Sequence, residues 1–422
     1  MNKLKFSFLF ILLILLFLSI VYFYFFSSSN KKQILVISQV RYSSLNSWNE
    51  DDHLKAFNTF RISCKKLIRL NPEKNMGAFL KGKHNSYPFA GKVLDWVEPC
   101  NDSLIKNLQN NKEAKLYFQK WFIPFSISYN YSENVFSKGD DLGLFTGYYE
   151  PLIEGSTTYT NEYKYPIYSY PENYIKVHLG DFNKSLKGKF ITGKITDNSF
   201  IPADSRNEIN KGYIDLKSKV LYWLKDDVEA FFLHIQGSGI IELPNGKKER
   251  IMYDGNNGYD YFAIGKELIK KNYISKENLS MQSIKKWLKN NQDKKDEILE
   301  LNKRYIFFKK SNDLFAKGSQ NTALIAQRSL AIDINWIPLG IPLWIDIDNY
   351  GDPNKLRIKK LMISQDTGSA IKGIIRGDIF FGTGNKPGLL AGKFKQYGKY
   401  YVLLPRKLII KRNKENINEK EK

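Results

Sequence analysis

Residues 6–26 constrain this chain more than any other segment, because they carry no charge over a length that spans the hydrocarbon core of a bilayer. Lys3 and Lys5 precede the run, which ends in YFYFF without the small residues of a signal-peptide cleavage site. We therefore predict a signal anchor and linker over residues 1–32, with a cytoplasmic N-terminus and the body outside the membrane. Cleavage within the serine run at 27–29 is the alternative, and it exports the same body.

The remaining sequence has the composition of a folded protein, with 42% hydrophobic residues. The formal net charge of +22 is spread along the chain; such a surplus can favour an anionic polymer or membrane surface, but a compositional bias towards Lys and Asn explains it as well. Without a basic recognition helix or a stacking-aromatic motif, we expect no nucleic-acid partner. Cys64 and Cys100 can form one disulfide in an oxidising compartment, but two buried thiols would leave the same pattern.

Hydrophobic periodicity divides the body into helical and strand-rich parts. Residues 50–125 carry a helical period, with apolar positions 54, 57, 60, 64 and 67 on one face. The helical period returns between 260 and 300, where Ser280 is the expected N-cap of an apolar-striped helix. Short apolar and aromatic runs broken by turn residues predict strands at 143–149, 163–168, 220–224, 230–243, 305–308 and through much of 323–404.

Several common kinds of catalytic site are absent from the sequence. It contains no G-x-x-x-x-G-K-[ST], no G-x-S-x-G and no H-E-x-x-H motif. The four histidines, His53, His84, His178 and His234, stand far apart, and the two cysteines do not complete a metal-ligand spacing. We therefore predict no metal site.

Three aspartates stand out because apolar and glycine residues surround them: Asp333, Asp366 and Asp378. A carboxylate in such a setting must be hydrogen-bonded or take a raised pKa, which is how an enzyme keeps an acid protonated at neutral pH. For each of the three aspartates, the alternative is that its side chain caps a turn beside a glycine. The D-T-G at 366–368 also matches aspartic proteases, but the second D-[TS]-G of a pepsin-like chain is missing.

The chain closely resembles the membrane-bound lytic murein transglycosylase A family, whose C-terminal part is the 3D domain named after three aspartates. The resemblance covers roughly residues 140–405 in ordered blocks. These are FTGYYEP at 145–151, HIQGSG at 234–239, YDGNNGY at 253–259, SMQ at 280–282, FFK at 307–309, Asp333 and the segment 366–384.

The resemblance implies a mainly β, α+β fold in which a double-psi β-barrel carries a second, inserted β-barrel-like domain, with a glycan groove between them. We expect the barrel domain, with N-terminal helices, at 33–151 and 316–410. The inserted groove domain is expected at 152–315, and a disordered charged tail at 411–422.

The resemblance also implies a site and a reaction. The family's acid/base falls on Asp378, with Asp366 and Asp333 as companion catalytic aspartates. Its groove-lining motifs fall on Thr146, Tyr148, Gln236, Gly237 and Ser238, although Tyr148 or Tyr149 can equally be a core aromatic. His234 and Gln236 would share one face of the strand expected there.

The implied reaction cleaves the β-1,4 bond between N-acetylmuramic acid and N-acetylglucosamine in peptidoglycan, without water, leaving a 1,6-anhydromuramyl end. No metal or organic cofactor is implied. Well-known members are outer-membrane lipoproteins held by a cysteine that is missing here, so we expect this body at the periplasmic face, held by its own anchor; an outer-membrane location is the alternative that the family analogy leaves open. A catalytically dead wall-binding module and an aspartic protease are the alternatives.

Overall fold

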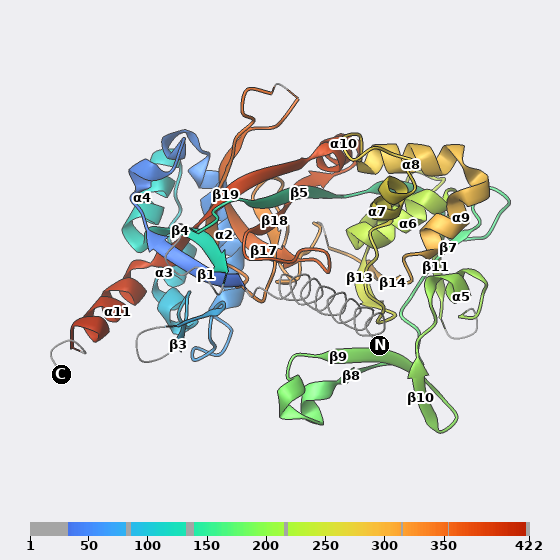
Figure 1. The fold of residues 1–422 in the computed structure, drawn as a ribbon, viewed down its shortest axis with the longest axis horizontal. Helices are drawn as coiled ribbons and strands as arrows, with labels where there is room; N and C mark the ends of the chain where they lie inside the picture. Colours follow the sequence, from blue (N-terminus) through green and yellow to red (C-terminus); the bar gives the residue numbers. More distant parts are fainter. Residues whose placement is uncertain are drawn as a thin grey trace, which may run out of the picture.

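The structure, a computed structural model, describes residues 33–81, 86–131, 139–214, 218–313, 315–352 and 354–418. The anchor predicted at 1–32 lies outside these ranges. Within them, no helix combines the length and apolar character needed to cross a bilayer. Two β-bodies, a barrel and an inserted sheet, lie side by side with helices around both (Figure 1).

A closed six-stranded barrel forms the first body. Its strands are β5 (Gly143–Glu150), β15 (Ser329–Ile332), β16 (Pro342–Ile347), β17 (Ile358–Thr367), β18 (Arg376–Thr383) and β19 (Lys395–Pro405). They follow the ring order β5, β18, β15, β17, β16 and β19, and β19 pairs with β5 to close it. β18 runs parallel to β5, and β15 runs parallel to β17. The predicted α+β class with a β-barrel is confirmed.

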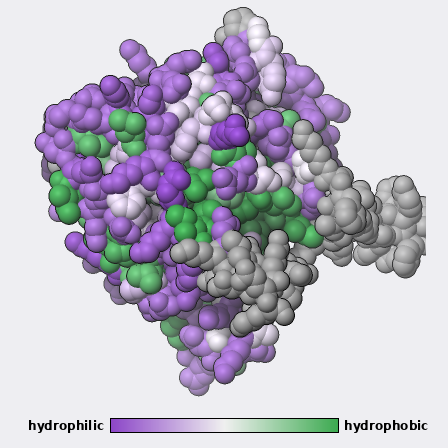
Figure 2. All heavy atoms as spheres, turned by 90° about the vertical axis from the view of Figure 1, so that its left-hand side faces the viewer, coloured by the Kyte–Doolittle hydropathy of each residue, from purple (hydrophilic) through white to green (hydrophobic). Residues whose placement is uncertain are grey.

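The N-terminal part covers the barrel with helices and extends its sheet. β1 (Gln33–Gln39) pairs with β4 (Phe122–Tyr131), which pairs with β19. The helices are α2 (His53–Leu67), α3 (Leu94–Ile105) and α4 (Asn111–Trp121). β2 (Phe79–Lys81) pairs antiparallel with β3 (Ser86–Pro88). The predicted apolar face of α2 is confirmed, because positions 57, 60, 64 and 67 are buried. Figure 2 faces this side and shows a largely hydrophilic surface with a hydrophobic area near its centre.

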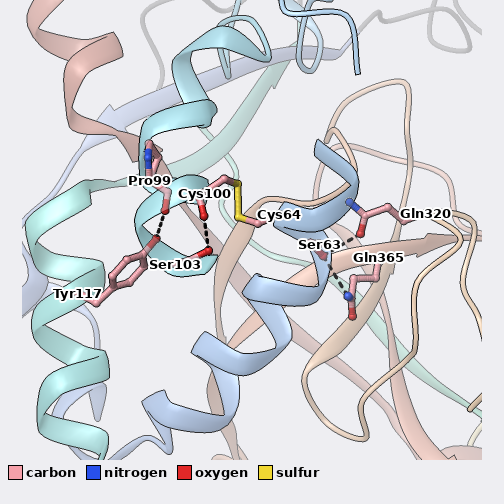
Figure 3. Close-up of a disulfide and its surroundings, with 8 residues drawn as sticks. All are labelled: Ser63, Cys64, Pro99, Cys100, Ser103, Tyr117, Gln320 and Gln365. Atoms are coloured by element: carbon pink, nitrogen blue, oxygen red, sulfur yellow. Dashed lines mark hydrogen bonds between the residues drawn. A yellow bond between two sulfur atoms is a disulfide. The ribbon is translucent and has the colours of Figure 1, made fainter. Parts of the chain in front are cut away.

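A disulfide joins Cys64 of α2 to Cys100 of α3, which decides between the two alternatives left open for these cysteines (Figure 3). The neighbouring Ser63 faces the barrel. Its hydroxyl donates to Gln320 Oε1 over 2.8 Å and accepts from Gln365 Nε2 over 3.0 Å. The helix that the disulfide holds is therefore tied to the residue before Asp366.

The second body is a six-stranded sheet in the order β14, β13, β12, β6, β11 and β7. The bounds are β6 (Leu152–Ser156), β7 (Tyr165–Tyr168), β11 (Val220–Leu224), β12 (Ser238–Glu242), β13 (Lys248–Asn256) and β14 (Ile306–Ser311). Its helices are α5 (Arg206–Asn210), α6 (Asp227–Gln236), α7 (Ile264–Lys270), α8 (Met281–Asn290) and α9 (Gln292–Glu300). Ser280 caps α8 as predicted. The chain enters this body after β5 and returns to the barrel with β15, whereas the exact domain bounds stay a prediction.

A separate three-stranded sheet, which we call the arm, projects from the second body at the lower edge of Figure 1. It contains β8 (Tyr174–His178), β9 (Phe190–Thr196) and β10 (Ser199–Pro202), with two short 3₁₀ turns between β8 and β9.

The strand predicted over 230–243 is wrong in its first half, because residues 230–236 belong to helix α6. A continuous apolar run does not distinguish a strand from a buried helix by periodicity. Both ends of α6 carry helix caps in the structure. The Asp226 side chain accepts from the Glu229 amide at the N-terminus, and Gly237 adopts φ 78° at the C-terminus, where a left-handed residue commonly ends a helix.

The C-terminal part also departs from the prediction. After α10 (Asn385–Lys393) and β19, helix α11 runs over Arg406–Asn418, so the disordered tail expected from residue 411 is wrong as far as 418. Leu408 and Ile409 are buried against the helical side of the barrel, and Arg406 donates to the carbonyl oxygens of Gln119 and Lys120. These contacts anchor the start of a helix that continues into the charged segment.

Candidate active site

A cavity of about 460 Å³ lies where the barrel meets the inserted sheet. The barrel contributes Tyr148, Asp366 and Asp378 to its wall, and the inserted body contributes the segment 234–238 together with Arg304. Two of the three predicted aspartates, Asp366 and Asp378, therefore line the same cavity as the HIQGS block.

Asp378 lies on β18, in parallel register with Thr146 of β5. The Thr146 hydroxyl donates to Asp378 Oδ1 over 2.6 Å and accepts from Arg376 Nη2 over 2.8 Å. Burial raises the pKa of Asp378 to about 6, against the lowering effects of Arg376 and of the Thr146 hydrogen bond, while the charge of Asp366 adds to the rise. A carboxyl group with this pKa exchanges its proton close to neutral pH.

Asp366 is the last but one residue of β17, and four hydrogen-bond donors hold its carboxylate. Its Oδ1 accepts from the amide and hydroxyl of Ser319, at 2.8 and 2.9 Å, and from the Thr367 amide at 2.8 Å. The Tyr148 hydroxyl donates to Oδ2 over 2.8 Å. Burial raises the pKa of Asp366, and these hydrogen bonds oppose the rise because they favour the charged form. Asp366 is therefore a fixed acceptor with both oxygens engaged.

Tyr148 and Tyr149 take the two roles that the sequence left open. Tyr148 lines the cavity, and burial together with Asp366 raises its pKa well above the ordinary tyrosine value, so it stays a hydrogen-bond donor. Tyr149 is buried on the other side of β5, as expected from the alternation of side chains along a strand.

Asp333 does not line this cavity, contrary to its predicted place in the catalytic set. It follows β15, where Oδ1 accepts from the Asn335 amide and side chain at 3.1 and 2.9 Å. Its Oδ2 accepts from the Gly373 amide over 2.9 Å. Asp333 thus ties a turn to the loop whose residues 368–371 line the cavity, and its position supports a structural role.

The HIQGS block lines the cavity from the C-terminal end of α6 and the start of β12, and not from a single strand as predicted. His234 is buried in α6, and its Nδ1 lies 3.0 Å from Arg206 Nη1. Burial and the Arg206 charge hold the pKa of His234 well below its ordinary value, so the ring is neutral and Nδ1 accepts. Gln236 Oε1 accepts from the Tyr149 amide over 3.1 Å, Gly237 ends the helix, and Ser238 begins β12.

Arg376 and Ser319 are among the site residues that the sequence prediction missed. Arg376 stands two residues before Asp378, so the period of a strand already places both on one face. Ser319 had only an indirect signal in the preceding Gly318, where a Cβ would collide with the Gln365 carbonyl oxygen. Glycine at 318 allows the turn to approach β17 closely enough for Ser319 to reach Asp366.

A second cavity, of about 510 Å³, lies on the other side of β5. Tyr149, Gln282 and Leu389 line it together with ion-paired Lys285 and Glu229. The first cavity contains Asp378, whose pKa is raised to about 6, so we place the candidate site there. The described ranges also contain no group of three His, Cys, Asp or Glu side chains suited to a metal ion.

A buried ion pair holds the two bodies together beside the site. Glu150, at the end of β5, accepts from Arg250 of β13 through Nε at 2.8 Å and Nη2 at 3.1 Å. The Thr383 hydroxyl at the end of β18 donates to the same carboxylate over 2.8 Å. The strands that carry Thr146 and Asp378 are therefore both fixed to the inserted sheet.

Two families match successive parts of the chain. Residues 144–309 match the MltA specific insert domain, and residues 328–404 match the 3D domain. Membrane-bound lytic murein transglycosylase A of Escherichia coli (strain K12) is 33% identical over 264 residues, which cover 61% of this chain and 65% of that protein. The protein of the same name from Vibrio cholerae is 30% identical over 275 residues, covering 63% and 67%.

Solved structures extend the likeness over most of the chain. A membrane-bound lytic murein transglycosylase from Agrobacterium tumefaciens superposes with a TM-score of 0.75 at 27% identity, covering 89% of this chain and 99% of that one. MltA from Neisseria gonorrhoeae gives a TM-score of 0.71 at 30% identity, covering 89% and 95%. With both domain families matched in order and relatives similar in sequence and in fold, the chain belongs to the membrane-bound lytic murein transglycosylase A family.

Proposed function

We propose that the protein is a peptidoglycan lytic transglycosylase that uses Asp378 as both acid and base. The observation that carries the proposal is the state of Asp378, a carboxyl group in the cavity between the two bodies whose pKa is raised to about 6. About a tenth of such a group is protonated at pH 7, and more at lower pH, so it can act as a general acid. The names of the relatives supply the substrate class.

In the proposed first step, Asp378 protonates the glycosidic oxygen while the bond from that oxygen to C1 of the muramyl residue breaks. Thr146 holds Oδ1, and Oδ2 accepts no hydrogen bond from the described residues, so Oδ2 is the oxygen that meets the substrate. In the second step, the muramyl 6-hydroxyl attacks C1 and gives its proton to the Asp378 carboxylate. The acid is restored, a 1,6-anhydro ring forms, and no water is consumed.

Asp366 serves as a fixed negative charge in this scheme. Its four hydrogen-bond donors occupy both oxygens, which suits electrostatic stabilisation of positive charge at C1 better than proton transfer. Most glycosidases need two working carboxyl groups, because water or the enzyme must attack the sugar. An attack from within the substrate removes that need and gains from proximity.

The two alternative functions fit the site less well. An aspartic protease shares one proton between two aspartates, whereas no hydrogen bond joins Asp366 to Asp378 in the described structure, and each has donors of its own. Binding of the cell wall without catalysis does not require a carboxyl group whose pKa is raised to about 6.

We propose glycan strands of the cell wall as the partner, and wall turnover and remodelling as the role. The relatives' name, membrane-bound, and the uncharged run at 6–26 support attachment to the cytoplasmic membrane with the body at its periplasmic face. The chemistry proposed for Asp378 uses no metal or organic cofactor.

The test is mass spectrometry of purified sacculi incubated with the detergent-solubilised full chain, with Asp378→Asn, and with Asp348→Asn as a matched change on an exposed loop. We expect anhydro-muropeptides from the wild type and Asp348→Asn only, while Asp378→Asn still binds sacculi. Reducing-end products would indicate a hydrolase with a second working carboxylate. Binding without release by the wild type would indicate a wall-binding module, and cleaved peptides would indicate a protease.

A further inference from the structure

The arm has one face that nothing in the described structure covers. In the register of β8 with β9 and of β9 with β10, one face collects only apolar residues and a glycine, because directly paired residues share a face. These are Ile175, Val177, Ile191, Gly193, Ile195, Phe200 and Pro202. Four of the apolar side chains on this face are 40% to 47% exposed.

Part of the opposite face of the arm packs on the inserted body. Lys194 forms an ion pair with Asp204, and the Tyr174 hydroxyl donates to the same carboxylate over 2.8 Å. Thr192 lies so close to Gly258 that a Cβ on the glycine would collide with it. Because side chains alternate along a strand, these contacts direct the apolar face away from the body.

The tip of the arm adds an aromatic residue and positive charge. Phe182, between the two 3₁₀ turns, is 80% exposed. Residues 174–202 contain five lysines and two aspartates, a net charge of +3. Lys184, Lys187 and Lys189 all lie in the exposed tip region.

We propose that the arm docks on an anionic lipid surface, with the apolar face and Phe182 in the interfacial layer and the tip lysines on the lipid headgroups. Exposed apolar side chains bordered by lysines are the composition of interfacial membrane contacts. The apolar face has no side-chain donor or acceptor for a sugar, so it does not suit a glycan strand. Only residues 27–32 lie between the run predicted to be in the bilayer and β1. This linker can hold the start of β1 at most about 20 Å from the bilayer, so the body stays close to a lipid surface.

The test is hydrogen exchange of the 174–202 amides in the full chain, held in phosphatidylglycerol nanodiscs, in phosphatidylcholine nanodiscs and in detergent. We expect exchange at the tip to slow roughly tenfold in the anionic discs relative to the neutral ones. The variant with Phe182→Ser and Lys187→Gln should lose most of this slowing. Ile105→Ser, a matched change at an exposed apolar residue of α3, should keep it.

Equal exchange in anionic discs, neutral discs and detergent would overturn the proposal. Slowing in detergent that grows with protein concentration would assign the face to a second copy of the chain. Slowing that appears only when sacculi are added would assign it to a wall component. Either result would also overturn docking on lipid, and neither would bear on the chemistry proposed for Asp378.

Discussion

Thr146→Val tests the electrostatics of the site most directly, because valine keeps the shape of threonine and removes its hydroxyl. In the structure that hydroxyl donates to Asp378 Oδ1 over 2.6 Å, so it stabilises the charged form of the carboxyl group. Its loss favours the protonated form. The pKa of Asp378 should therefore rise above its value of about 6.

The size of the rise follows from the strength of the bond. A hydrogen bond to a charged group contributes about 1.5–3 kcal/mol, and one pKa unit corresponds to about 1.4 kcal/mol. Water or Arg376 can partly replace the lost donor, so we expect about one unit, to a pKa near roughly 7. At pH 7 the protonated fraction would then rise about fivefold.

The assay is the pH dependence of anhydro-muropeptide release from sacculi at low substrate concentration. Since the proposed reaction starts from protonated Asp378, wild-type activity should fall as the pH rises through about 6. In Thr146→Val the falling limb should lie about one pH unit higher. Thr146→Ser retains the hydroxyl and should leave the limb in place.

The reasoning would be refuted by a limb that stays in place or moves down in Thr146→Val while the melting temperature is unchanged. A loss of activity at every pH, with no displacement of the limb, would show that Thr146 matters for binding and not for the pKa of Asp378.

Three further predictions follow from the contacts. In Asp366→Asn the loss of a negative charge should lower the pKa of Asp378 and move the same limb to lower pH; an upward shift would contradict this. Asp51 and Arg328 form a buried ion pair in which Oδ1 and Nη2 are 2.7 Å apart. Asp51→Ala leaves Arg328 without its carboxylate partner and should lower the free energy of unfolding by roughly 3–5 kcal/mol in denaturant titration; a loss below ~1 kcal/mol would refute this. Replacing Cys64 and Cys100 by serine opens a loop closed across a separation of 36 residues and should cost about 4 kcal/mol by the chain-entropy relation; equal stability of the oxidised wild type and the double variant would argue against the bridge.

The local sequence pattern was sufficient to predict several features of the structure. The α2 face and the Ser280 cap were predictable because a helix repeats its face every three to four residues and its first turn needs a side-chain acceptor. Asp366 and Asp378 stood out because carboxylates inside apolar strands require a partner or a raised pKa. The ordered motif blocks sufficed to recognise the family.

Other features depended on contacts between distant segments. The continuous apolar run before Gly237 is compatible with a helix or a strand, and packing against the inserted sheet decided for the helix. Asp333 has the same apolar sequence surroundings as Asp366 and Asp378. Its carboxylate nevertheless accepts from the Gly373 amide and does not line the cavity. Periodicity assigns a residue to a face and leaves the opposing segment undetermined.

The sequence by itself determined which carboxyl groups had to be unusual, and the tertiary structure decided how they differ. Thr146 and Asp378 are 232 residues apart, and only the parallel pairing of β5 with β18 brings the hydroxyl to the carboxylate. Tyr148 and Asp366 are 218 residues apart, and the barrel places the tyrosine hydroxyl of β5 beside the carboxylate of β17. Hydrogen bonds and desolvation act over a few ångströms, so the pKa of each aspartate depends on which distant strand the fold places beside it.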